Sequence, residues 1–214
     1  MSTNKKSSGA SLTCLLKLLT IAGLMSGCIL TVPLKPEVNR TPGVSQIPLA
    51  VGVYYDTAFR AYEHHFIIGS TSFNISVGES SVALFDEVFP IVFKRAVPVI
   101  SRPPLPPGGP GVAAVIEPKI EKFEMDHPFI LIGTTFSAEI TYRFTLYSNE
   151  GEQIVSSTFM GHGEMPASLF NQTRPPGEAT SLAMEEAVEK FMSDFSNLPQ
   201  AQQWIRQAGV ADAK

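Results

Sequence analysis

A cysteine at position 28 is the residue of this chain with the clearest potential for chemistry. It directly follows Leu24, Met25, Ser26 and Gly27, at the end of an apolar stretch. A cysteine thiol is a nucleophile that can be covalently modified. The small side chains of Ser26 and Gly27 let the backbone lie extended in the cleft of a peptidase. The residue types and their spacing therefore predict a processing site at Cys28, with modification of its thiol.

The segment before this cysteine has the layout of an export signal. It begins with Lys5 and Lys6, and residues 12–25 are apolar apart from Lys17 and small or polar residues. A transmembrane helix needs about 20 apolar residues, so this shorter stretch with a charge inside it is a poor anchor. We therefore expect residues 1–27 to be a signal peptide. A plain secretory signal followed by an incidental cysteine is the alternative.

Residues 1–28 resemble the precursors of bacterial lipoproteins, in which a lipobox ends the signal peptide. The resemblance implies cleavage between Gly27 and Cys28 and acylation of Cys28, which becomes the first residue of the mature chain. Each buried acyl methylene contributes about 0.8 kcal/mol, so a triacylated cysteine would attach the protein to a membrane permanently. Ile29 follows the cysteine instead of an aspartate. In enteric-type bacteria this pattern implies the outer membrane, with the folded part in the periplasm.

Cysteine content and charge limit the possible functions. Cys14 would be lost with the signal and Cys28 would carry lipid, which leaves no thiol for a disulfide or a metal site. The chain has a formal net charge of −4, and removing Lys5, Lys6 and Lys17 with the signal makes it more acidic. An acidic surface repels phosphates. We therefore expect no nucleic acid partner and no broad basic face for lipopolysaccharide.

The segment that follows the cysteine lacks the pattern of a folded element. Residues 28–46 contain Pro33, Pro36 and Pro42 among polar residues, without an apolar period. This composition predicts a lipidated flexible tether. At about 3.3–3.6 Å per residue, the tether would reach about 60 Å when fully stretched. We expect it to hold the folded part near the membrane but free to meet partners.

Residues 47–207 are predicted to form a single domain, followed by a frayed tail at residues 208–214. Among its strands, residues 136–147 have the most regular alternation of apolar and polar side chains, and Pro118 indicates a strand at an edge or with a bulge. Extended or alternating apolar patterns predict strands at residues 47–55, 65–77, 112–125, 136–147 and 153–160.

Helical spacing of apolar residues predicts two amphipathic helices. Ser80 caps the first, which Pro90 should kink or end. Thr180 or Ser181 caps the second, after a break in the chain at residues 175–177. The economical packing places both helices on one face of a largely antiparallel sheet of four to five strands, so the predicted class is α+β.

A proline-rich loop at residues 98–111 is predicted between the first helix and the next strand. Prolines and glycines at this density let neither a helix nor a strand continue. We interpret the segment as a stiff, exposed loop, with Arg102 and Leu105 as candidate docking residues. A polyproline ligand motif is the alternative, although the segment falls between core elements.

The predicted order of elements, together with the lipobox, is similar to a group of small envelope lipoproteins and domains. The group includes the lipoprotein that plugs the lipopolysaccharide-assembly translocon, auxiliary lipoproteins of lipid-transporting ABC systems, and domains of curli-secretion and Tol-type proteins. Residues 115–123, residues 138–143 and the sequence Asn149-Glu150-Gly151 carry this likeness. It implies an accessory role in the envelope and transfers no functional residue.

No catalytic constellation stands out in the sequence. His64 and His65 are adjacent, so on a strand they would point to opposite faces, and a zinc site needs three or four convergent ligands. His162 and Glu164 form the other conspicuous polar group. The chain has no Gly-x-Ser-x-Gly elbow and no phosphate-binding loop. We therefore expect no catalytic residue, no metal and no cofactor, and a protein that is not an enzyme.

Two functions from different classes remain. The first is a membrane-anchored module that docks on a larger envelope protein complex. The alternative is an accessory or carrier that binds lipid between its helices and its sheet. An apolar cavity of several hundred Å³ would favour the carrier. A packed interior with an exposed apolar patch or strand edge would favour docking.

Overall fold

The computed structural model describes residues 29–39, 43, 45–106, 111–126, 135–167 and 171–211. Over these residues, five strands form the larger sheet, in the order β5 (Phe93–Pro98), β2 (Ile47–Val53), β6 (Ala114–Asp126), β7 (Thr135–Tyr147) and β8 (Gln153–Pro166). A smaller sheet has the order β1 (Ile29–Thr31), β4 (Thr71–Ile75) and β3 (His64–Ile68). The predicted α+β class and five-stranded sheet are confirmed, whereas the smaller sheet was not predicted.

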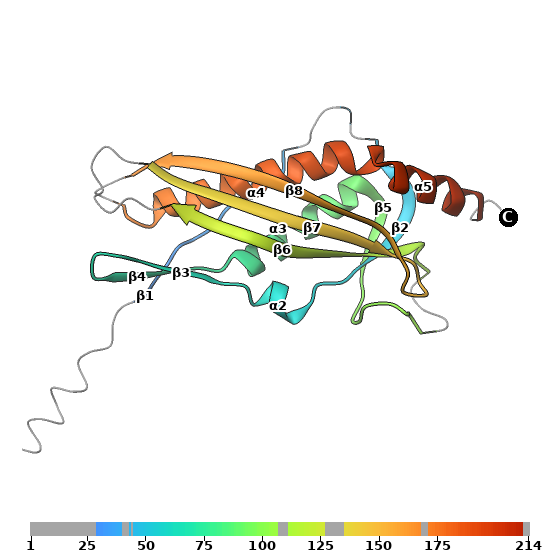
Figure 1. Ribbon diagram of the computed structural model, residues 1–214, viewed down its shortest axis with the longest axis horizontal. Helices are drawn as coiled ribbons and strands as arrows, with labels where there is room; N and C mark the ends of the chain where they lie inside the picture. Colours follow the sequence, from blue (N-terminus) through green and yellow to red (C-terminus); the bar gives the residue numbers. More distant parts are fainter. Residues whose placement is uncertain are drawn as a thin grey trace, which may run out of the picture.

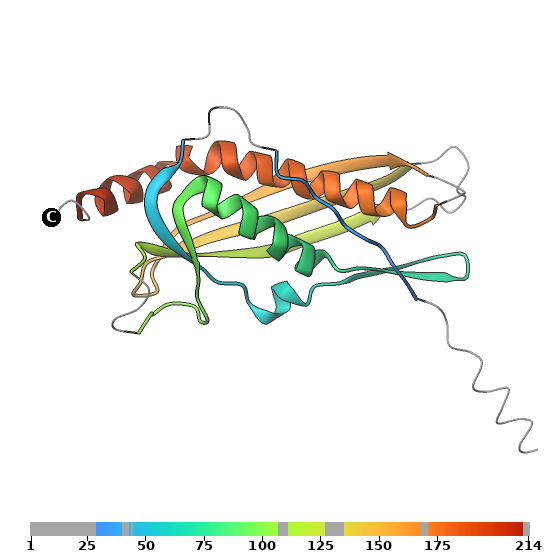
Figure 2. The same cartoon turned by 180° about the vertical axis from the view of Figure 1, so that it is seen from behind.

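Two long helices, α3 (Val77–Val92) and α4 (Arg174–Asp194), cover one face of the larger sheet. The smaller sheet lies at one end of the elongated molecule, and α5 (Pro199–Ala211) lies at the other (Figures 1 and 2). Strands β6, β7 and β8 form an antiparallel meander, while β2 runs parallel to both β5 and β6. The short helix α2 (Thr57–Arg60) connects the two sheets.

The alternation predicted for β7 is confirmed. Phe136, Ala138, Ile140, Tyr142 and Phe144 are fully buried on the face that meets the helices, and the residues that alternate with them are mostly half-exposed. Thr145 is the exception, because it is only 6% exposed although it belongs to the opposite face. In the register of β6 and β7 it lies directly across from Glu117, which is also buried.

Aromatic rings fill the space between the helices and the sheet. Phe144 of β7 stacks on Phe191 of α4 with ring centroids 4.1 Å apart. Phe85 and Phe89 of α3 meet the Phe144 ring edge-on at 5.1 and 6.2 Å. All four side chains are completely buried. The phenylalanines therefore form a packed core in which each ring meets another at favourable geometry.

A hydroxyl pair lies inside this core. The oxygens of Tyr142 and Ser81 are 2.6 Å apart, and Ser81 donates its proton to the carbonyl of Val77 at 2.7 Å. Because a serine hydroxyl has one proton, Tyr142 must be the donor to Ser81. Burial raises the pKa of Tyr142 well above its usual value. The phenol therefore stays neutral and joins α3 to β7.

Helix α4 approaches β8 through residues without large side chains. A Cβ at Gly161 would lie 1.9 Å from the carbonyl oxygen of Ala183, and one at Gly163 would lie 2.2 Å from that of Ala179. Ala179 and Ala183 are themselves fully buried. The two glycines of β8 are thus required for the close contact between strand and helix.

The helices begin earlier than the sequence predicted. Helix α4 starts at Arg174, so Pro175 and Pro176 lie in its first turn instead of breaking the chain. Proline fits there because the first amides of a helix have no intrahelical acceptor. Thr180 and Ser181, which were expected as caps, are buried inside the helix. Helix α3 passes Pro90 and ends two residues later, in agreement with the predicted effect of that proline.

Two further differences concern the strands. The run at residues 65–77 is a hairpin of two strands, and β5 was missed because its apolar residues continue directly from α3. Strand β6 pairs with β2 only as far as Ile116. Pro118 therefore lies in a part of β6 that has no β2 partner on that side, as predicted for a strand at an edge.

The end of the chain also differs from the prediction. Helix α5 continues to Ala211, so fraying from residue 208 is wrong for residues 208–211. Residues 212–214 lie outside the described residues.

Residues 29–39 differ most from the prediction. Ile29 begins β1, which pairs in parallel with β4. Residues 32–39, here called the N-terminal strap, run along α4 (Figure 2). The amide of Lys35 donates to the Ser181 hydroxyl at 3.1 Å, and the amide of Glu37 donates to the Glu185 carboxylate at 2.8 Å.

A flexible tether is therefore the wrong description of residues 29–39. The prolines of the strap prevent regular structure, but its free amides find acceptors on α4 and Val32 is buried. Residues 29–39 therefore belong to the folded domain, which was predicted to start at residue 47. Residues 40–42 and 44 lie outside the described residues.

We expect aspartate substitutions to lower the free energy of unfolding by different amounts on the two faces of β7. Ile140→Asp buries an unpaired carboxylate and should lower the free energy of unfolding by at least about 3 kcal/mol. Thr141→Asp lies on the half-exposed face and should lower it by about 1 kcal/mol or less. Thr145→Asp should behave like Ile140→Asp, because it places a second carboxylate across from Glu117. Urea unfolding followed by circular dichroism measures all three, and equal effects at positions 140 and 141 would refute the assignment of faces.

A second prediction concerns the contact between α4 and β8. Gly161→Ala forces strand and helix apart and should lower the free energy of unfolding by about 2–3 kcal/mol. Gly209→Ala is the control, because its Cβ meets nothing within 4 Å and alanine favours a helix. The control should be neutral or stabilising in the same thermal unfolding measurement. If Gly161→Ala left the free energy of unfolding unchanged, the close contact between α4 and β8 would not require glycine at this position.

Candidate functional site

The smaller sheet, in which Ile29 lies, and the loop predicted for docking are at opposite ends of the long axis. Gly27 and Cys28 lie outside the described residues, and Ile29, the next residue, lies in the smaller sheet. Arg102 and Leu105 lie in the loop between β5 and β6, beside the turn between β7 and β8 (Figures 1 and 2). Ile29, the residue that follows Cys28, is therefore far from the candidate docking loop.

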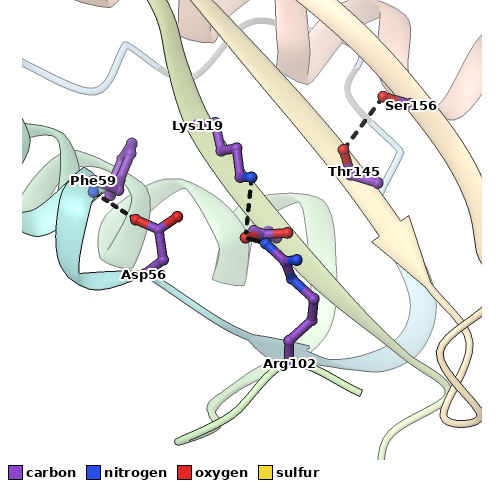
Figure 3. A network of polar contacts seen from close by, with 7 residues as sticks. Asp56, Phe59, Arg102, Lys119, Thr145 and Ser156 are labelled. Atoms are coloured by element: carbon purple, nitrogen blue, oxygen red, sulfur yellow. Dashed lines mark hydrogen bonds and ion pairs between the residues drawn. The ribbon is translucent and has the colours of Figure 1, made fainter. Parts of the chain in front are cut away.

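A buried carboxylate fixes this loop to the sheet. Glu117 of β6 is 1% exposed and lies on the sheet face opposite the helices, since its neighbour Pro118 pairs with inward-facing Phe144. The guanidinium of Arg102 donates a hydrogen bond to the Glu117 carboxylate. The ammonium of Lys119 lies 3.8 Å from the same oxygen. Figure 3 shows the two cations approaching the carboxylate from opposite directions.

The surroundings of Arg102 strengthen this ion pair. Its guanidinium carbon lies 5.7 Å from the ring centroid of Tyr147, over the face of the ring. The hydrogen bond to Glu117 raises the pKa of Arg102 above its usual value. Burial, and then the charge of Glu117, raise the pKa of Tyr147. Arg102 thus remains charged and the phenol of Tyr147 remains neutral. The guanidinium can therefore bind the Glu117 carboxylate and lie over the Tyr147 ring at the same time.

Backbone hydrogen bonds fix the loop at further points. The amide of Val99 donates to the carbonyl of Val53 at 3.0 Å, and the amide of Leu105 donates to the carbonyl of Asn149 at 2.9 Å. The side-chain amide of Asn149 donates in turn to the carbonyl of Val112 at 2.9 Å. The described part of the loop is therefore attached to β2, to β6 and to the turn before β8.

These contacts change the roles of the two candidate docking residues. Arg102 attaches the loop to the sheet, and Leu105 is half-buried. Sequence analysis missed Ile100, whose side chain is fully exposed. A signal was present, because Val99 and Ile100 are adjacent apolar residues in an extended segment, where neighbouring side chains point to opposite sides. Only one of them could enter the core.

The outer edge of β8 is less open to a partner than an edge strand usually is. The amide of His162 donates to the Glu186 carboxylate at 2.5 Å, which lowers the pKa of Glu186. The ammonium of Lys190 donates to the carbonyl of Met160 at 2.8 Å. Glu186 and Lys190 are themselves 3.0 Å apart on one face of α4. Two of the groups that would pair with an added strand are thus occupied.

Two surface cavities lie beside α4. One of about 590 Å³ lies between the strap and the start of the helix, and Pro33, Met165 and Leu182 line it together with polar and charged residues. Its charged lining residues are Lys35, Glu37, Arg174, Glu178 and Glu185. Its neighbour of about 520 Å³ is lined largely by glutamates. Both cavities open to the surface and have charged side chains in their lining, so neither is an enclosed apolar cavity.

The histidines singled out in the sequence have local partners. His65 lies 3.5 Å from Glu63, and His162 lies 3.2 Å from Glu164. Within the described ranges, no three residues of the histidine, cysteine, aspartate and glutamate types are grouped to hold a metal ion.

Comparison with known proteins gives structural likenesses alone. No protein-family model matches the chain, and no curated protein sequence matches it. A protein of the DUF330 family from Xanthomonas campestris is 12% identical, with a TM-score of 0.45 over 87% of this chain and 99% of its own. A minor lipoprotein from Acinetobacter baumannii is 8% identical, with a TM-score of 0.40 over 72% and 94%. A lipoprotein from Neisseria meningitidis is 11% identical, with a TM-score of 0.35 over 56% and 87%. Because these TM-scores are below 0.5, the likenesses carry no argument about function.

We expect the loop to depend on its ion pair. Arg102→Ala leaves the Glu117 carboxylate buried with a weaker partner and should lower the free energy of unfolding by about 2–3 kcal/mol. Adding Glu117→Gln should recover part of this loss, because the remaining side chain is neutral. Lys122→Ala is the control, since its ion pairs with Glu124 and Glu139 are at the surface and should contribute little to stability. Equal effects of Arg102→Ala and Lys122→Ala in urea unfolding would contradict this role of Arg102.

Proposed function

We propose that this protein is a lipid-anchored accessory subunit that docks on a larger protein complex of the cell envelope and acts by binding, not by catalysis. Acyl groups on Cys28, which the lipoprotein resemblance implies, provide the anchor. The docking surface is the loop between β5 and β6, at the other end of the molecule. Ile29 at the position after the cysteine favours the outer membrane, with the domain in the periplasm.

The observation that carries this proposal is the fixed position of Ile100. Its fully exposed side chain lies between Val99, which bonds to β2, and Arg102, which bonds to buried Glu117. A single exposed isoleucine is ordinary on a protein surface. On a loop that is already ordered, however, it can enter a partner's pocket with little further loss of conformational entropy. This arrangement suits a docking residue.

A lipid carrier is the alternative function. It would need an apolar cavity for acyl chains between the helices and the sheet. In the described part of the chain, the rings of Phe89, Phe144 and Phe191 occupy that region, and the 590 Å³ cavity beside α4 is open to the surface with charged side chains in its lining. These observations support docking over lipid transport.

The anchor can be tested by replacing the cysteine. Cys28→Ser should move the protein from the membrane fraction to the soluble fraction of a cell lysate. The physical reason is that none of the helices in the described ranges has the length and hydropathy to cross a bilayer. Ultracentrifugation followed by immunoblotting measures the distribution. A Cys28→Ser protein that sediments with membranes and resists high salt would contradict the anchor.

Docking can be tested at Ile100. Ile100→Asp should reduce capture of the envelope partner from detergent-solubilised membranes at least about tenfold, because it places a charge in an apolar pocket. Its thermal stability should not change, since the side chain is exposed. Ile67→Asp is a matched control at the opposite end, where Ile67 is 64% exposed. Stoichiometric lipid in the purified wild type, together with unchanged capture by Ile100→Asp, would refute docking and favour the carrier.

A further inference from the structure

The folded chain leaves no free length between the presumed anchor and the smaller sheet. Ile29, the residue after Cys28, is already paired with Ser72 of β4. Consecutive Cα atoms are about 3.8 Å apart. An acylated Cys28 would therefore hold the edge of this sheet at the membrane surface, and not at the end of a long tether.

One face of the smaller sheet carries an apolar row beside this point. Ile29 of β1, Ser72 of β4 and Ile67 of β3 are cross-strand neighbours in the register. Their side chains therefore share a face. Phe66 and Phe73 belong to the next row, so they point to the other face, where they stack 5.0 Å apart and are buried. The row of Ile29, Ser72 and Ile67, here called the outer row, thus faces away from the core.

The outer row concentrates exposed apolar surface. Ile29 is 63% exposed and Ile67 is 64% exposed. These are two of the six large hydrophobic residues that are exposed among the described residues. The next row on the same face contains His65, which pairs with Glu63. Binding at a membrane interface grows with the apolar area that is buried there, and these two exposed isoleucines would contribute to it.

We propose that the outer row rests on the lipid bilayer that holds the acylated cysteine, so that the domain has a fixed orientation with Ile100 directed away from the membrane. This inference rests on the proposed acylation of Cys28. We favour lipid over a protein as the occupant for two reasons. The acyl chains enter the bilayer one residue from Ile29, and none of the three side chains in the outer row is charged.

The mature chain offers a direct test, because Cys14 would leave with the signal and Cys28 would be acylated. A single introduced cysteine is then the only free thiol. Ser72→Cys keeps both isoleucines and places a probe between them, and Ser101→Cys places the same probe next to Ile100. Each acylated variant is labelled with an environment-sensitive dye. It is then reconstituted into vesicles of phosphatidylethanolamine and phosphatidylglycerol that contain spin-labelled lipid.

We expect the spin label to quench the dye at position 72 at least threefold more than the dye at position 101. Adding Ile67→Asp to Ser72→Cys should reduce this quenching, because a charge in the outer row opposes contact with lipid. Flotation of the same vesicles tests the anchor separately. Protein that floats without selective quenching at position 72 overturns the orientation alone, and protein that does not float overturns the anchor and the orientation together. Loss of partner capture by Ile67→Asp, without quenching at position 72, would identify the outer row as a protein contact and also overturn the proposal.

Discussion

Helix α4 can occupy its place only because β8 has no side chain at Gly161 and Gly163, and much of the structure depends on that close approach. It brings Phe191 onto Phe144 and so completes the aromatic core. The same position turns Ser181 and Glu185 toward the strap. A single helix therefore meets the sheet, the core and the first residues of the folded chain. A change at its contact with β8 should affect all three.

The fold was predictable from sequence where local patterns decide the structure. The alternation in β7 follows from burial of one face, and the apolar spacing of α4 follows from contact with the sheet. The start of α4 was not predictable in the same way, because prolines both break chains and begin helices. The strap was missed for a different reason. Lys35 bonds to Ser181, 146 residues away, and no local pattern shows an acceptor at that distance.

The candidate docking loop was also predictable only as far as local sequence patterns decide its structure. The proline-rich composition of the loop indicated that it is neither helix nor strand, which is correct for its described residues except Pro98, the last residue of β5. It did not show that Arg102 reaches a buried carboxylate on β6, because burial of Glu117 depends on packing between the loop and the sheet. The role of Arg102 consequently changed from a contact for partners to an attachment of the loop, and exposed Ile100 took its place. A charged residue in a loop is more conspicuous in a sequence than the aliphatic neighbour that it positions.

The ion pair of Glu186 and Lys190 along β8 has a consequence for many copies of the protein. Copies held by the proposed lipid anchor would share a thin layer in which their effective concentration far exceeds that in a dilute solution. Under such crowding, an open strand edge would invite copies to join into continuous sheets. With the amide of His162 and the carbonyl of Met160 already bonded within the molecule, edge-to-edge assembly would first have to break both hydrogen bonds. The occupied edge of β8 would thus keep neighbouring copies on one membrane from joining edge to edge. The loop with Ile100 would stay available to a partner.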